Sequence, residues 1–297
     1  MKKIIHCCFT SHQEVMFRSP DDVGAFLNLL ALTSWRYGVD IFADTEMSNH
    51  VHLLLFSSDT NQLSEFICSL RKRYAWYFNQ KYSRPKGERL GEKYFFSLVV
   101  EGNYHMISAC SYVLRNGLHH GVSGTAFMYP YSSINDMFVP ELGKTDRPCQ
   151  GSRLFDEWVM SPSGVFLRPC FEQLRQTELL FVSPGSFEYN MFRKTDEKWL
   201  QEQDQDRNGL PSVGLPEIEP DNNEDAIKNY LYNERSSTFK NTRSDMELCG
   251  IIDRCILPEY KVQSIYQLKQ EKRESIRRIL TNEFHVSEQQ ASRCLWL

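Results

Sequence analysis

The sequence predicts an α+β protein: a ferredoxin-like arrangement of strands and helices, followed by a mainly α-helical C-terminal extension. Two observations lead to this prediction. The first 118 residues alternate short apolar runs with longer stretches of helical periodicity, in the order strand, helix, strand, strand, helix, strand, helix. That order is the ferredoxin-like βαββαβ unit with one extra helix. The end of the chain instead shows helical spacing alone.

Breaker residues and side-chain spacing define the elements of the N-terminal part. The run Pro20-Asp21-Asp22 opens the first helix, and Gly38 ends it. In the next helix, apolar residues such as Phe66, Leu70 and Tyr74 recur at helical spacing. The predicted strands are residues 3–10, 40–46, 49–57 and 94–101. The predicted helices are residues 20–37, 61–82 and 104–118.

Four segments are expected along the chain. They are a first domain over residues 1–135, an extension over 136–200 whose packing the sequence leaves open, an acidic linker or loop over 201–223, and an α-helical region over 224–297. In the last segment, one helix begins near Asp225 and another spans residues 267–284. Ser287 could cap a final helix that runs to Leu297, so the end of the chain resembles a helix-turn-helix.

Composition limits the class of protein. The chain has 297 residues, a formal net charge of -4 and 9 Cys. Eight basic residues between Arg71 and Lys93 are offset by an acidic stretch from Glu202 to Asp225, so the overall charge hides a basic patch. The odd number of cysteines shows no zinc-type pairing, which indicates free thiols in a reducing compartment. Without a long apolar span or a signal peptide, we expect a cytoplasmic protein.

The most informative motif is His50-Val51-His52, at the start of the predicted strand 49–57. Side chains two apart on a strand point to the same face, so both imidazoles leave one side of the sheet. Two neutral imidazoles side by side form half of a divalent-metal site. Hydrolases with a third histidine two positions later are excluded, because that position is Leu54.

A second pair, Tyr112 and Asn116, lies in the predicted helix 104–118. Residues four apart share one helix face, so a phenol and an amide oxygen project together. If this face meets the histidine strand, the site combines a nucleophile with donors for a hard divalent ion. Tyr104 is the rival nucleophile. His119 and His120 could reach the metal or a phosphate, but we expect them in a solvated turn before Gly121.

These motifs resemble those of a known family. Asn49-His50-Val51-His52-Leu53-Leu54-Leu55 and Tyr112-x-x-x-Asn116 are similar to the signatures of single-tyrosine HUH transposases of insertion sequences, and most of all to REP-associated tyrosine transposases. Ser48 and Gly117 stand where that group usually has proline. The resemblance covers about residues 3 to 135, so the first domain would be the catalytic domain.

The resemblance implies a fold and a reaction. The fold is a four-stranded antiparallel sheet with both histidines on a central strand. His50, His52 and Asn116 would hold Mg²⁺ or Mn²⁺ on a scissile phosphate, and Tyr112 would attack and become linked to a 5′-phosphate. The substrate would be single-stranded or hairpin DNA. We expect a monomer or homodimer that does not bind membranes.

The basic patch is the expected DNA-binding surface, by charge and base stacking. Its candidate residues are Arg71, Lys72, Arg73, Tyr77, Arg84, Lys86 and Arg89. Two other functions stay open at this point. One is a non-catalytic nucleic-acid-binding regulator on the same fold, and the other is a metal-dependent phosphodiesterase without a covalent step.

Overall fold

The computed structural model describes residues 3–11, 14–138, 168–192, 232–233, 238–239 and 243–297. The strands are β1 (Lys3–Thr10), β2 (Asp40–Met47), β3 (His50–Ser57), β4 (Phe96–Val100), β5 (Tyr232–Asn233) and β6 (Thr238–Phe239). The α-helices are α1 (Pro20–Tyr37), α2 (Thr60–Tyr82), α3 (Asn103–Leu114), α4 (Asn116–His119), α5 (Arg168–Phe181), α6 (Pro184–Phe192), α9 (Asp245–Ile251), α10 (Gln270–Glu283) and α11 (Glu288–Leu295). No helix in these ranges is long and apolar enough to cross a membrane.

The main sheet has the strand order β2-β3-β1-β4, and every neighbouring pair is antiparallel. This confirms the ferredoxin-like four-stranded antiparallel sheet, with β3 and β1 in the centre. β3 pairs with β1 over their whole lengths, from Lys3 opposite Ser57 to Thr10 opposite His50. β3 also pairs with β2, with one register shift between Ile41 and Ala43.

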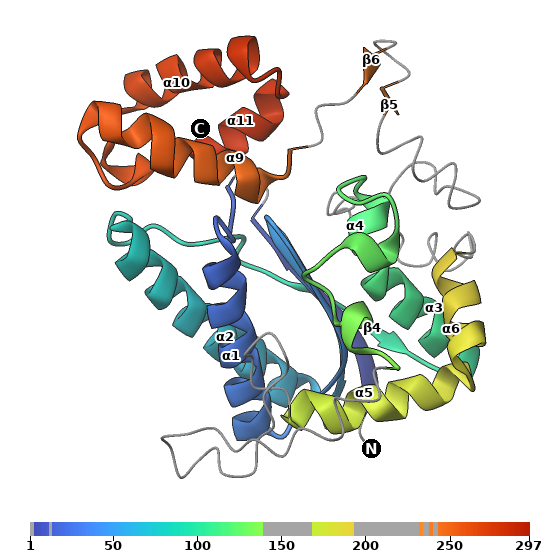
Figure 1. Cartoon of the computed structure of the whole chain (residues 1–297). Helices are drawn as coiled ribbons and strands as arrows, with labels where there is room; N and C mark the ends of the chain where they lie inside the picture. Colours follow the sequence, from blue (N-terminus) through green and yellow to red (C-terminus); the bar gives the residue numbers. More distant parts are fainter. Residues whose placement is uncertain (1–2, 12–13, 139–167, 193–231, 234–237, 240–242) are drawn as a thin grey trace.

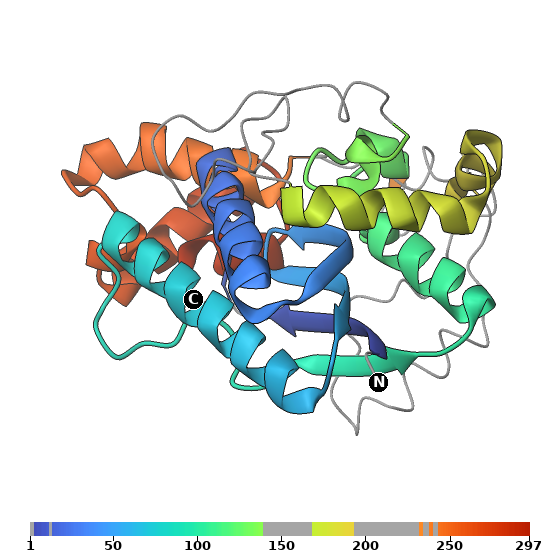
Figure 2. The same ribbon diagram turned by 90° about the horizontal axis from the view of Figure 1, so that it is seen from below.

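Alternation along the central strands gives the sheet two different faces. Val51, Leu53 and Leu55 belong to one core, which α1 and α2 cover with side chains such as Phe26 and Phe66. Leu54 belongs to a second core on the other face, together with side chains of α3 and α5. Figures 1 and 2 show α1 and α2 on one side of the sheet and α3 on the other, with α5 running beside β2.

The predicted ends of the long helices agree with the structure, and local bonds explain them. The backbone N–H of Ser19 donates to Asp22 Oδ2 at 2.9 Å at the start of α1. Gly38 ends this helix with φ 62°, a left-handed conformation that glycine adopts without steric cost. Asp59 Oδ1 accepts the backbone N–H of Gln62 at 2.8 Å and caps α2.

The predicted helix 104–118 is wrong as a single element. It divides into α3 and α4 at Arg115, whose φ of -91° and ψ of 7° depart from helical values. The predicted strand 94–101 is shorter than expected, and the predicted helix 267–284 begins only at Gln270, after a 3₁₀ turn over Ile265–Gln267.

The C-terminal helices pack against the N-terminal domain. Ile276, Leu280 and Leu295 are fully buried and share one core with residues of α1, α2 and the sheet. Ser287 caps α11, as predicted, by accepting the backbone N–H of Gln290 at 3.1 Å. The predicted linker 201–223 and the helix expected from Asp225 lie outside the described residues.

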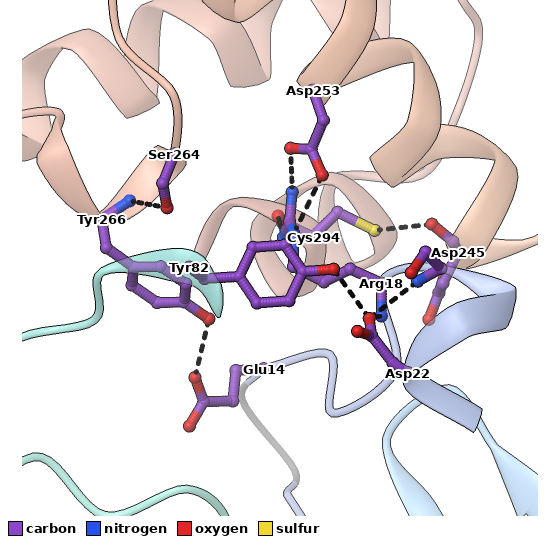
Figure 3. A network of polar contacts seen from close by, with 10 residues as sticks. Glu14, Arg18, Asp22, Tyr82, Asp245, Asp253, Ser264, Tyr266 and Cys294 are labelled. Carbon is purple, nitrogen blue, oxygen red and sulfur yellow. Dashed lines mark hydrogen bonds and ion pairs between the residues drawn. The ribbon is translucent and has the colours of Figure 1, made fainter. Parts of the chain in front are cut away.

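A buried polar network joins these helices to the loop between β1 and α1 (Figure 3). The Arg18 side chain, 1% exposed, is ion-paired with Asp253 at 2.7 Å and donates to the Cys294 carbonyl at 2.8 Å. Tyr266 donates to Glu14 at 3.4 Å in the same network. Because these groups are buried, their mutual hydrogen bonds are what makes their burial tolerable.

Candidate active site

The two histidines of β3 leave the sheet on the face covered by α3. His50 is 2% exposed and His52 is 0% exposed, and their ring centroids lie 5.1 Å apart. Across the sheet, His52 stands opposite Cys8 of β1 and Thr45 of β2. Thr45 donates its hydroxyl to the Val113 carbonyl of α3 at 2.8 Å, which ties this helix to the histidine face.

Each nitrogen of His50 faces an amide oxygen. Nδ1 lies 2.9 Å from Asn49 Oδ1, and Nε2 lies 3.0 Å from Asn116 Oδ1. Asn49 lies in the tight turn between β2 and β3. The Ser11 backbone N–H holds it in place by donating to the Asn49 carbonyl at 2.7 Å. The structure therefore brings together His50 and Asn116, two of the predicted metal ligands.

His52 is held by β1. Its Nδ1 lies 2.9 Å from His6 Nε2, and its Nε2 lies 3.7 Å from Cys8 Sγ. The His6 and His52 rings are stacked with centroids 5.1 Å apart. Sequence reasoning missed His6. Its signal was the alternation His6-x-Cys8 on a strand that pairs with the histidine strand, because both side chains then point to the same face.

Tyr112 of α3 packs edge-on against two imidazoles. Its ring centroid lies 5.5 Å from His52 and 5.6 Å from His6, and its side chain is fully buried. On its other side it stacks on His119 at 5.1 Å. The rival Tyr104 lies in the first turn of α3, and its side chain is outside the described residues. Among the side chains that the structure describes, Tyr112 is thus a tyrosine that contacts His52 and His6.

The break at Arg115 changes how Asn116 reaches the site. Asn116 is the first residue of α4 and does not share a continuous helix face with Tyr112. Gly117 follows it, and a Cβ built there would lie 2.5 Å from Tyr129 Cγ. Because only glycine lets the ring of Tyr129 approach so closely, this residue fixes the packing of α4 and hence the position of Asn116.

His119 and His120 are not in a solvated turn, so that expectation is wrong. His119 is 6% exposed against Tyr112, and the ring of His120 lies 4.6 Å from that of His50. Burial, together with the charge of Arg115, holds the pKa of His119 well below its ordinary value. Burial and the charge of Arg293 lower the pKa of His120 to about 4. Both rings point inward because α4 folds back onto the sheet. The local sequence does not reveal this packing.

The donor set suits a divalent cation. Nδ1 of His50 is bound to Asn49 Oδ1 and Nδ1 of His52 to His6, so the Nε2 atoms, which face Asn116 Oδ1 and Cys8 Sγ, are the nitrogens that would bind a metal. Neighbouring ligands of an octahedral ion with bonds of about 2.1 Å lie about 3.0 Å apart. His50 Nε2 and Asn116 Oδ1 have this separation, 3.0 Å. Within the described ranges, no three His, Cys, Asp or Glu side chains form a metal site, so the candidate set depends on the amide oxygen.

Comparison with known proteins identifies the N-terminal region. Residues 2–116 match the family model described as "Transposase IS200 like". Residues 2–116 are similar to an IS200-like transposase domain. This domain contains the histidine pair, Tyr112 and Asn116 and ends before His119. No match appears among the curated proteins.

Two solved structures are similar to this chain. One is a REP-associated tyrosine transposase bound to a REP hairpin, with a TM-score of 0.40 and 11% identity, covering 54% of this chain and 93% of that one. The other is described as a "putative transposase from deinococcus radiodurans r1", with a TM-score of 0.30 and 18% identity, covering 35% of this chain and 83% of that one.

The β2 strand carries two buried carboxyls that the sequence did not single out, Asp44 opposite Leu53 and Glu46 opposite Val51. Burial, with the charge of Asp136, raises the pKa of Asp44 to about 7. Burial and the charge of Asp44 raise the pKa of Glu46 well above its ordinary value. The Glu46 carbonyl accepts the Tyr129 hydroxyl at 2.7 Å, so this strand also helps to place the ring that packs on Gly117.

The predicted DNA-binding residues fall into two groups. Lys72, Arg73, Lys86 and Arg89 are exposed. Three others are engaged within the protein. Arg71 donates to the carbonyls of Glu92 and Lys93, and Tyr77 lies 3.3 Å from Asp22 Oδ1.

Arg84, the third engaged residue, is buried. Its guanidinium pairs with Glu14 at 2.7 Å and donates to the carbonyls of Glu88 and Arg89. The Arg84 side chain therefore organises the loop after α2. α2 covers the sheet face opposite the histidines, so the basic run Arg71–Arg73 and the candidate active site lie on different sides of the sheet.

Proposed function

We propose that this transposase domain cleaves and rejoins DNA strands through a covalent 5′-phosphotyrosine intermediate, with a divalent metal, on single-stranded or hairpin DNA. One observation carries the proposal: a single buried cluster holds Tyr112 against His52 and His50 against Asn116. The family match supports the transposase class. The motif resemblance supports the choice of single-stranded or hairpin substrates.

The covalent step belongs to Tyr112. Its phenolic oxygen attacks the phosphorus of a phosphodiester, the bond from phosphorus to the 3′-oxygen breaks, and the phenol loses its proton while the 3′-oxygen gains one. The tyrosine then carries the 5′-phosphate. Because the phosphodiester bond energy is kept in this link, attack by a new 3′-hydroxyl rejoins DNA without a nucleotide cofactor.

His50, His52 and Asn116 are the residues that would hold Mg²⁺ or Mn²⁺. When bound, such an ion polarises a non-bridging phosphate oxygen and offsets the charge that develops in the transition state. His6 and Asn49 act on the ligands themselves. Each one engages the Nδ1 atom of an imidazole, which orients the ring and leaves Nε2 toward the site.

The burial of Tyr112 bears on the substrate. Its side chain is 0% exposed, so groups that cover it have to move before a phosphodiester can reach the hydroxyl. A flexible single strand enters such a recess more readily than a stiff duplex, whose backbone curves only over many base pairs. This supports unpaired DNA, or the unpaired flank of a hairpin, as the substrate.

The test uses end-labelled hairpin oligonucleotides with single-stranded flanks, incubated with the full chain and Mg²⁺ and separated on denaturing gels. Cleavage and a protein–DNA band should appear, and EDTA should abolish both. His50→Ala should also abolish both, whereas Asn116→Ala should do less because water replaces one oxygen ligand of a hard cation. His285→Asn is the matched control, since His285 is exposed on the turn between α10 and α11.

The gels also separate the other functions. Binding without cleavage would favour a non-catalytic regulator, and cleavage without a covalent band would favour a phosphodiesterase. Full activity of the wild type in EDTA would contradict the metal assignment.

A further inference from the structure

The Asp245 carboxylate links Arg293 of α11 to Ser48, which lies in the turn just before His50. Arg293 Nε and Nη2 donate to Asp245 at 2.8 and 3.1 Å, a two-pronged pairing that fixes the plane of the guanidinium. The oxygen that accepts Nε–H, Asp245 Oδ2, also accepts the Ser48 hydroxyl at 2.6 Å. Ser48 is two residues before His50. The C-terminal helices are therefore hydrogen-bonded to the turn that leads into β3.

His120 lies against His50. Its ring lies 4.6 Å from that of His50, and its buried Nε2 has no hydrogen-bond partner among the described residues. The charge of Arg293 also contributes to the low pKa of His120. A buried ring nitrogen without a partner is costly unless a ligand satisfies it.

Arg293 has a donor left over, unlike Arg18 and Arg277. Its side chain is 23% exposed, and Nη1 has no hydrogen-bond partner in the part of the chain that the structure describes. By contrast, Arg18 is fully engaged in the network of Figure 3, and Arg277 pairs with Glu274 and Glu288.

We propose that Arg293 and His120 bind a DNA phosphate beside His50, so that the C-terminal helices complete the active site of the transposase domain. The inference rests on the proposed function and names a further part of its DNA site. Arg293 Nη1–H and the imidazole N–H of His120 donate to phosphate oxygens, and Asp245 holds the guanidinium in place. Both donors lie outside the residues that match the family model.

The position of the phosphate follows from the partners of the two donors. Because Asp245 ties Arg293 to Ser48 and the His120 ring touches His50, the bound phosphate lies next to the metal end of β3. It then belongs to the strand that is cleaved or to its immediate neighbour. Removing the positive charge of Arg293 should weaken DNA binding by one phosphate contact and also slow cleavage.

The experiment measures hairpin binding at increasing NaCl in a Tyr112→Phe background, which prevents cleavage. Arg293→Gln alone would leave the buried Asp245 carboxylate without its partner, so Asp245→Asn is compared with Asp245→Asn/Arg293→Gln. An amide pair replaces the ion pair in the double variant. In a plot of the logarithm of the DNA-binding constant against the logarithm of the salt concentration, its slope should be smaller in magnitude by about 0.7 to 0.9, the value for one phosphate contact. Arg278→Gln, at an exposed position of α10, should leave the slope unchanged.

A second measurement needs no substitution at Arg293. In the Tyr112→Phe protein, bound hairpin should protect Arg293 from modification by phenylglyoxal, with Arg278 modified equally in both states. Equal slopes for the two Asp245 variants, or unprotected Arg293, would overturn the inference. Failure of the Tyr112→Phe protein to bind any hairpin would instead count against the proposed function, so the two failures are distinguishable.

Discussion

At the scale of single residues, Gly117 shows how one missing side chain shapes the site. It sits between Asn116, which faces His50, and a turn that carries two buried histidines. A Cβ there would meet Cβ, Cγ and Cδ2 of Tyr129 at 2.6, 2.5 and 2.9 Å. Tyr129 cannot retreat freely, because its hydroxyl donates to the Glu46 carbonyl at 2.7 Å.

Gly117→Ala should therefore destabilise the protein by about 1–3 kcal/mol, the usual range for overpacking, and should reduce cleavage by displacing Asn116. Gly24→Ala is the matched control. Gly24 lies within α1 with nothing within 4 Å of a built Cβ, so the added methyl should stabilise the helix by about 1 kcal/mol. Urea unfolding measures both values, and equal stability of the two variants would contradict the packing argument.

Asp44 makes stability depend on pH. Its pKa rises from 3.8 to about 7 in the native state, so between these values the native protein holds a proton that the unfolded chain releases. Stability from this group is present at low pH and is lost as the pH rises through this window, at up to about 1.4 kcal/mol per pH unit. Asp44→Asn should flatten this decline, as measured by urea unfolding from pH 5 to 8. An unchanged slope would show that Asp44 is not the group responsible.

The residues of the candidate site were only partly accessible from the sequence. His50 and His52 could be placed on one face because strand alternation is local, and Tyr112 and Asn116 could be linked to them by the motif resemblance. His6, His119 and His120 could not be placed in the same way. Their positions depend on the pairing of β1 with β3 and on the fold of α4, which are non-local.

At the scale of elements, strand and helix bounds in the N-terminal part were predictable because the breakers are explicit. Gly38 and the cap at Asp59 are examples. The break at Arg115 has a local signal that the prediction did not use, since Asn116 and Gly117 have low helix propensity and form a common turn pair. Tertiary contacts, among them the Tyr129 ring on Gly117, then hold α4 in place.

The exposed face of α2 is the element-scale test of DNA binding. Lys72 and Arg73 are exposed one turn from Trp76, which is 68% exposed and available for stacking on a base. Lys72→Gln/Arg73→Gln should weaken hairpin binding and lower the log–log salt slope by about 0.7 for each lost single-strand phosphate contact. Arg36→Gln, at an exposed position near the end of α1, is the control. If the double variant keeps the wild-type slope, this face does not contact DNA.

At the scale of the whole molecule, the C-terminal helices and the N-terminal domain share buried surface. Tyr266 packs against Phe78 of α2 at 6.2 Å, and Trp296 packs against Tyr266 at 5.0 Å. The sequence of the last two helices resembles a helix-turn-helix. The apolar pattern of such helices is the same whether they belong to a DNA-binding module or pack on another domain. Only the partners of Ile276, Leu280 and Trp296 show that these side chains face the protein.

A chain that ends before Arg243 should therefore expose the apolar surface of α2 and aggregate. It would also remove Asp253 and the Cys294 carbonyl, which are partners of Arg18. Sedimentation and solubility of the truncated protein measure this. Recovery of a soluble, monodisperse protein with wild-type cleavage would contradict it and would favour a separate DNA-reading module.

The most direct test of the central claim is the identity of the residue that becomes linked to DNA. Covalent protein–DNA species formed with a hairpin oligonucleotide and Mg²⁺ are digested with protease and nuclease, and the modified peptide is sequenced by mass spectrometry. We predict a 5′-phosphonucleotide on Tyr112, and no covalent species from a Tyr112→Phe protein that still binds the hairpin. A covalent species from Tyr112→Phe, or modification at Tyr104, would contradict it.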